Sequence, residues 1–191
     1  MAWYDLEDKV ETKREYLARV KYDKIVCDRS ASFRRIIGDN IEKNIQYRLI
    51  STVAFNAIVV LQYIQELYKI DEIFLVIYRM NEKSVNKFKQ LIDNNVTGGI
   101  LVSSFFRNNK IYEKWAKNLV DYCTGNKNMK ISFAVTHAKI FIVKTKCGKH
   151  IVFEGSGNFS DNARIEQYLL EDNKEVYNFH KQWINDILNL E

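Results

Sequence analysis

Five polar residues between positions 137 and 166 have the types and the order that phosphate chemistry requires. His137 and Lys139 are two positions apart, so their side chains point to the same face of an extended strand. An imidazole titrates near neutral pH and can act as nucleophile or as general acid and base, while an ammonium neutralises the non-bridging oxygens of a phosphate. Hydroxyl, amide and carboxylate groups follow at Ser156, Asn158 and Glu166. We interpret these five residues as the catalytic part of a phosphodiester-cleaving site.

The segment after the histidine predicts a hairpin that brings a glycine-containing turn beside it. Residues 138–144 and 151–154 have the apolar content of two strands, with turn residues between them. Gly155 and Gly157 then permit a close approach of the backbone, and we assign them to substrate binding. The alternatives are plain: the glycines could merely form a turn, and Glu166 could be a surface charge.

Alternating strand-like and helix-like patterns precede the hairpin and must position it. A continuous apolar run at 73–77 is typical of a strand buried on both faces, and Asn81 can cap the helix that follows. This order predicts an α/β fold with a mixed, mostly parallel sheet flanked by helices. The other expected elements are strands at 47–53, 100–105 and 130–135, and helices at 54–67, 85–92, 108–122 and 173–188.

Two arginines follow the expected parallel strands. Ligands of such sheets gather beyond the carboxyl ends of the strands, and Arg79 and Arg107 lie just after the runs at 73–77 and 100–105. We assign both to substrate binding as phosphate contacts. The alternative for each is a polar loop residue.

Composition favours one packed domain that binds a polyanion. The chain has 191 residues, 47% of them hydrophobic, which predicts a single domain over residues 1–191. Residues 1–40 form a charged extension whose alternating signs predict an exposed helix. The net charge of +5 favours nucleic acid, although the 24 acidic residues among 29 basic ones also fit a mixed surface.

The cysteines and the apolar runs favour a soluble protein of a reducing compartment. The three cysteines are widely separated and form no CxxC pair, so neither a disulfide framework nor a zinc cluster is indicated. The amino terminus has no apolar signal-peptide core, and the longest apolar run falls short of a membrane span. We expect a cytoplasmic protein with no membrane partner.

The linked tripeptide and tetrapeptide of the site carry a family resemblance. His-Ala-Lys at 137–139 followed by Gly-Ser-Gly-Asn at 155–158 resembles the His-x-Lys…Gly-Ser-x-Asn signature of the phospholipase D superfamily. The resemblance covers about 30 residues closely and is compatible with the α/β pattern before them. Like the small bacterial endonucleases of that superfamily, the chain carries one copy of the motif.

The resemblance implies a homodimer that builds one active site from two motifs. One His137 would attack phosphorus to give a phosphohistidine, and His137 of the partner subunit would protonate the leaving oxygen and then activate water. No metal or cofactor is needed in that scheme. Glu166 resembles the acidic residue that orients the histidine.

One position departs from the family pattern. The family places an Asp five residues after the motif lysine, where this chain has Lys144. By strand alternation Lys144 points away from His137, so it supports the site rather than reacts in it.

The function that the sequence favours is a nuclease, with DNA ahead of RNA as its substrate. The alternative is a degenerate relative that binds nucleic acid or a protein without cleavage, and a lipid phosphodiesterase is less favoured.

Overall fold

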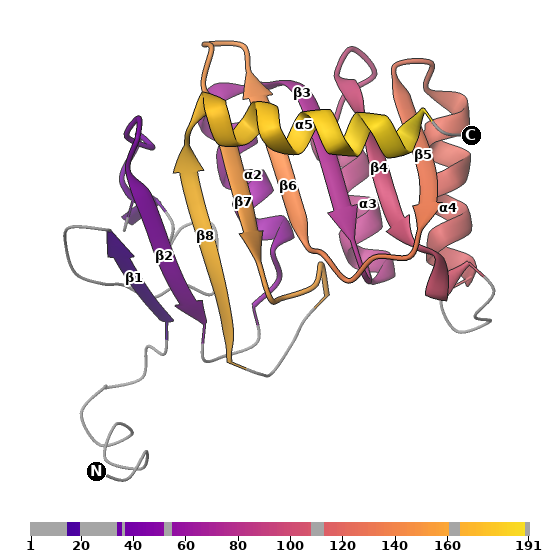
Figure 1. Ribbon diagram of the computed structural model, residues 1–191, viewed down its shortest axis with the longest axis horizontal. Helices are drawn as coiled ribbons and strands as arrows, with labels where there is room; N and C mark the ends of the chain where they lie inside the picture. The colour runs from indigo at the N-terminus through magenta and orange to yellow at the C-terminus, as the bar shows by residue number, and fades with distance from the viewer. Residues whose placement is uncertain are drawn as a thin grey trace, which may run out of the picture.

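A mixed sheet forms the centre of the molecule (Figure 1). The computed structural model describes residues 15–19, 34–35, 37–51, 55–107, 113–160 and 165–189. In these ranges eight strands pair in the order β1-β2-β8-β7-β6-β3-β4-β5. Their bounds are β1 Glu15–Arg19, β2 Gln46–Ser51, β3 Ile70–Ile77, β4 Thr97–Ser103, β5 Met129–Ala134, β6 Ile140–Thr145, β7 His150–Gly155 and β8 Glu166–Asp172.

The parallel part of the sheet consists of β3, β4 and β5. Helix α3 (Glu82–Leu91) connects β3 to β4, and α4 (Glu113–Gly125) follows β4 and leads to β5. The apolar run that predicted a doubly covered strand is buried throughout, from Ile73 to Ile77. Asn81 accepts a hydrogen bond from the Ser84 amide, as expected of the cap of α3. The predicted strand and helix alternation is confirmed over this region, except that residues 108–112 of the helix predicted at 108–122 lie outside the described residues.

The rest of the sheet is antiparallel, and this corrects the predicted share of parallel pairing. The mixed α/β sheet flanked by helices is confirmed, but five of the seven strand pairings are antiparallel. β6 and β7 are joined by a tight hairpin, which allows only antiparallel pairing. β8, which the sequence patterns did not predict, then pairs with both β7 and β2.

The charged amino-terminal region contributes a strand where a helix was predicted. Glu15–Arg19 forms β1 and pairs antiparallel with β2 at the edge of the sheet. Alternating charges suit an exposed helix and also an edge strand, where charged residues discourage association with other chains. Because the backbone pairs with β2, this segment is an edge strand and not a helix. Of the other residues of the predicted helix, 34–35 and 37 are helical, whereas 1–14, 20–33 and 36 lie outside the described residues.

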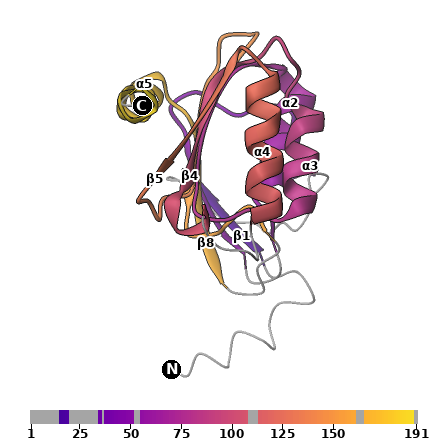
Figure 2. The same cartoon turned by 90° about the vertical axis from the view of Figure 1, so that its right-hand side faces the viewer.

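Helices cover both faces of the sheet (Figure 2). Helices α2 (Ile58–Tyr68), α3 and α4 lie on one face, and α5 (Lys174–Leu188) lies on the other. Asn173 caps α5 by accepting from the Glu175 and Val176 amides. No helix among the described residues is long and apolar enough to cross a bilayer.

Helix α5 crosses the sheet nearer one end and leaves the other end open (Figure 1). Tyr177, Ile184 and Leu188 of α5 pack on a small apolar cluster of β3, β4, β6 and β7. The carboxyl ends of β3, β4, β5 and β7 meet the amino ends of β6 and β8 at the opposite edge. We call this end, where the central strands of the sheet begin or terminate away from α5, the open edge of the sheet. It is where the predicted site residues lie.

Candidate active site

The two halves of the motif lie side by side at the open edge. Lys139 immediately precedes β6, and Ser156 immediately follows β7. The β6–β7 register pairs Ile140 with Glu154, and the Gly155 amide extends the ladder by donating to the Lys139 carbonyl at 3.1 Å. The hairpin therefore brings the His-x-Lys and Gly-Ser-x-Asn segments together, as the strand pattern predicted.

His137 and Lys139 are in direct contact. The Lys139 ammonium donates to the His137 carbonyl at 2.6 Å and lies 3.0 Å from His137 Nδ1. The lysine side chain is buried, with 6% exposed, whereas the histidine is exposed. A fixed cation thus sits under a ring that solvent and substrate can reach, which is the geometry that phosphate binding beside a nucleophile requires.

The surroundings of Lys139 weaken its hold on the proton. Burial lowers the pKa of the Lys139 ammonium, and the Glu166 carboxylate opposes this shift. The ammonium also lies 5.2 Å from the centroid of the Tyr78 ring, within the range of a cation–π interaction. A partly desolvated cation interacts more strongly with an incoming phosphate than a solvated one.

Ser156 and Glu166 form a second pair. The Ser156 hydroxyl donates to Glu166 Oε2 and accepts from the Gln167 amide at 3.1 Å. The Ser156 amide donates in turn to the Gln167 carbonyl at 2.9 Å. Glu166 is the first residue of β8 and is buried, so strand pairing fixes the position of its carboxylate. The Glu166 carboxylate thus accepts the serine hydroxyl and also attracts the Lys139 ammonium.

The glycines of the turn pack against a buried tyrosine. A Cβ atom on Gly157 would lie 1.9 Å from Tyr168 Oη, and one on Gly155 would lie 2.5 Å from the Tyr168 ring. Both positions therefore need glycine for packing, whatever they contribute to substrate binding. Asn158 Oδ1 and Tyr168 Oη are buried here without a hydrogen-bond partner among the described residues. Such atoms are costly unless a partner arrives.

Of the two arginines, Arg79 supports the turn and Arg107 lies beyond it. The Phe159 amide donates to the Arg79 carbonyl at 3.2 Å, and Arg79 Nη2 lies 3.3 Å from Ser160 Oγ. Arg107 is exposed, and its guanidinium lies 5.2 Å from the centroid of the Phe133 ring. Arg79 is thus placed beside the motif, whereas Arg107 follows the end of β4.

Lys144 lies on the opposite face of the hairpin, as strand alternation predicted. Ala138, Ile140 and Ile142 pack in the apolar cluster under α5. By strand alternation Lys144 lies on the same face of the sheet, the face that α5 covers. Its ammonium pairs with Asp71 Oδ2 at 2.8 Å, and this hydrogen bond raises the pKa of Lys144. Lys144 thus forms an ion pair with a carboxylate on β3.

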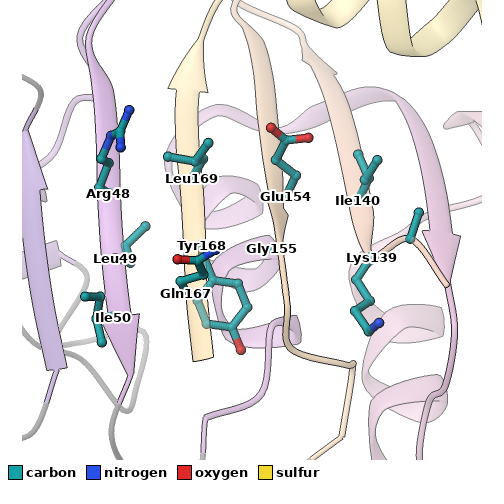
Figure 3. Close-up of a pocket in the computed structure, with 11 residues that line it drawn as sticks. Arg48, Leu49, Ile50, Lys139, Ile140, Glu154, Gly155, Gln167, Tyr168 and Leu169 are labelled. Carbon is teal, nitrogen blue, oxygen red and sulfur yellow. The ribbon is translucent and has the colours of Figure 1, made fainter. Parts of the chain in front are cut away.

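A depression on the sheet face runs up to the site (Figure 3). Its volume is about 520 Å³, and it lies on the part of the face that α5 leaves open. Lys139 and Gly155 belong to its lining, so the depression opens beside the motif. Its other lining residues are Ala138, which precedes β6, and residues of β2, β6, β7 and β8, among them Arg48, Glu154 and Gln167.

Sequence reasoning missed the aromatic residues of the site. The Tyr78 ring lies 4.4 Å from the His137 ring, centroid to centroid, and Tyr168 supports the glycines. Tyr78 could have been found, because it directly follows the apolar run of β3, at the end where ligands gather. Among the described residues, no three His, Cys, Asp or Glu side chains cluster as metal ligands.

Comparisons with solved structures identify the fold. No protein-family model matches the sequence, and no curated protein is significantly similar to it. A polyphosphate kinase from Porphyromonas gingivalis has a TM-score of 0.52 at 13% identity, over 99% of this chain and 29% of the kinase. Nuc, a phospholipase D family member from Salmonella typhimurium, has a TM-score of 0.51 at 12% identity. That match covers 68% of this chain and 84% of Nuc.

The likeness to the polyphosphate kinase spans 99% of this chain. The His-x-Lys and Gly-Ser-x-Asn segments, found from the sequence, lie together at one edge of the sheet. The chain therefore has a phospholipase D-like fold, and the residues that resemble that superfamily's motif lie together at its open edge.

Proposed function

We propose that the protein is a metal-independent phosphodiesterase, and specifically a nuclease, that acts as a homodimer. The observation that carries the proposal is the contact between the exposed His137 ring and the buried Lys139 ammonium. The pair lies beside the Gly155–Ser156 segment, whose Gly155 amide donates to the Lys139 carbonyl, in a phospholipase D-like fold. The net charge of +5 favours a nucleic-acid substrate. We propose DNA ahead of RNA.

The proposed reaction needs two histidines and has two steps. A ring nitrogen of His137 attacks phosphorus, the phosphorus–oxygen bond to the leaving group breaks, and His137 of the partner subunit donates a proton to that oxygen. The partner's His137 then takes a proton from water, which attacks phosphorus and breaks the phosphorus–nitrogen bond. Because each chain supplies one motif histidine, the site is complete only when two copies associate.

The remaining site residues bind the phosphate. Lys139 offsets charge on the non-bridging oxygens, and the Asn158 side-chain NH₂ donates hydrogen bonds to them. The Ser156 hydroxyl, which donates to Glu166 in this structure, turns its proton to the phosphate when substrate binds. Arg79 and Arg107 extend the cationic surface toward the flanking phosphates. Gly155 and Gly157 bring the backbone of the turn close to the substrate.

Cleavage in the presence of a chelator tests this function. We expect the protein to cut DNA or RNA in excess EDTA, and Lys139→Met to lower turnover ~10²- to 10³-fold, since it removes a preorganised positive charge. Rates are measured with end-labelled oligonucleotides. The Lys139→Met protein, purified identically, also controls for contaminating nucleases. No cleavage by the wild type, or equal cleavage by both proteins, contradicts the proposal.

A second function, binding without cleavage, is favoured by one observation. Lys144 stands where the superfamily has an acidic residue and forms its ion pair with Asp71 instead. In that case the protein retains affinity for nucleic acid or a protein partner, shows no turnover and forms no phosphohistidine. The chelator assay separates the two functions, because any motif-dependent turnover excludes the second.

Changing Lys144 to Asp tests whether its identity limits the reaction. We expect no rise in turnover, because the side chain points away from His137. We also expect a lower melting temperature, since the new carboxylate would face Asp71 in place of the present ammonium. Lys144→Met, which removes the charge alone, serves as the matched control. A marked gain in turnover with Asp would show that the lysine had impaired the site.

A further inference from the structure

A row of three rings leads away from the proposed nucleophile. The Tyr78 ring lies 4.4 Å from the His137 ring at a tilt of 55°, centroid to centroid. The Phe105 ring lies 6.2 Å from Tyr78 on a nearly parallel plane, with an interplanar angle of 23°. We call Phe105, Tyr78 and His137 the aromatic row. It starts at the reacting residue and ends at the surface.

The outer member of the row is unusually exposed for its type. Phe105 has 63% of its surface accessible, although phenylalanine is among the residues that folding most often buries. It lies in η2 (Ser104–Phe106), a single turn that follows the carboxyl end of β4. Ser103, the last residue of β4 and the residue before this turn, is buried, so the start of the turn is held in place. An accessible ring held beside the site is suited to stack on a flat ligand.

We propose that the aromatic row stacks an unpaired base next to the scissile phosphate, so that the substrate is a single-stranded nucleic acid. This inference rests on the proposed function, because it places the base beside His137. Every nucleobase has a flat face that can stack on an aromatic side chain, so the contact does not depend on sequence. Each such contact contributes about 1–3 kcal/mol. In a duplex the base faces are covered by their neighbours, so only an unpaired base can use Phe105.

Charge near the row fits the same ligand. Lys139 lies 5.2 Å from the centre of the Tyr78 ring, and its ammonium is the proposed phosphate contact. Arg107 follows Phe105 by two positions and is exposed. Rings for the bases and cations for the backbone are the combination with which proteins bind single strands without sequence preference. A lipid would find the cations but has no flat group for the ring.

Base stacking can be measured without turnover. In the His137→Asn protein, we expect a single strand that contains 2-aminopurine to lose fluorescence on binding. Phe105→Ala in the same background should abolish this quenching and weaken affinity about 5- to 150-fold, the equivalent of the stacking contribution. Phe105→Trp should retain both. Phe179→Ala is the matched control, because Phe179 is 65% exposed but lies on α5.

Three outcomes would overturn the stacking surface. They are unchanged quenching and affinity in Phe105→Ala, equal affinity for a duplex of the same sequence, and a change in solution mass of Phe105→Ala that shows a second copy of the chain on the ring. Failure of the proposed function looks different. A wild-type protein that stacks the base through Phe105 but cuts nothing contradicts the phosphodiesterase alone. One that cuts single and double strands equally, with or without Phe105, contradicts the stacking surface alone.

Discussion

Replacing His137 by Ala is expected to lower the rate of phosphodiester cleavage by at least ~10⁴-fold, because the variant loses both the nucleophile and the proton donor of the paired site. The ring is exposed, so the fold should tolerate its removal. Turnover is measured on a labelled single strand, and the melting temperature shows that the protein is folded. The wild type should also form a phosphohistidine that the variant lacks.

His150 provides the control for this substitution. It begins β7, packs against Tyr177 of α5 and therefore lies at the end of the hairpin away from the motif. His150→Ala should turn over substrate at a rate close to that of the wild type. Equal rates for the wild type and His137→Ala would exclude His137 as nucleophile, even if cleavage itself is observed.

Mixed dimers test whether two copies share one site. We expect activity to fall with the square of the wild-type fraction when wild-type and His137→Ala chains are refolded together. At equal amounts about one quarter of the activity should remain, because only pairs with two histidines are complete. A remainder of about one half would mean that each chain acts alone. The solution mass of the wild type, measured in parallel, shows whether it forms a dimer.

Local periodicity predicted the part of the site that one hairpin builds. The common face of His137 and Lys139 follows from the two-residue repeat of extended chain, and their contact agrees with it. The same repeat placed Lys144 on the other face. These predictions needed only the strand and its partner. They did not depend on how the rest of the sheet is ordered.

The features that the sequence patterns missed depend on pairing between strands that are distant in sequence. β8 was not predicted, since Glu166 was read as a residue of the motif rather than as the start of a strand. Its pairing with β7 and β2 is set by the whole sheet. Tyr78 and Phe105 follow different strands, and only the parallel alignment of β3 with β4 brings their rings together. A single sequence contains no periodic signal for such contacts.

The N-terminal region shows the same limit. Charge alternation predicted a helix there, but Glu15–Arg19 pairs with β2 and is a strand. Local propensity is a weak guide when a free sheet edge can supply backbone hydrogen bonds. The structure thus departs from prediction where segments distant in sequence meet.

Gly157→Ala is expected to destabilise the protein by about 1–3 kcal/mol or more, as overpacking of a filled interior does. The new Cβ would lie 1.9 Å from Tyr168 Oη and 2.7 Å from Cζ. The tyrosine has little room to move, because its ring stacks on Phe153 at 5.1 Å and packs against Phe55 at 5.2 Å. In a chain of this size each kcal/mol lowers the melting temperature by about 2–4 °C.

Two further variants show whether the clash with Tyr168 is the cause. Gly125→Ala, at the end of α4, introduces a Cβ that meets nothing within 4 Å and should leave the melting temperature unchanged or slightly raised. Tyr168→Phe removes a buried hydroxyl that has no described partner, so it should cost little alone and recover part of the loss in the double variant. Without such recovery, the tyrosine hydroxyl is not what requires glycine.

Gly157→Ala should also lower turnover, because the same turn carries Ser156 and Asn158. The packing of the turn against Tyr168 therefore constrains the positions of the proposed site residues.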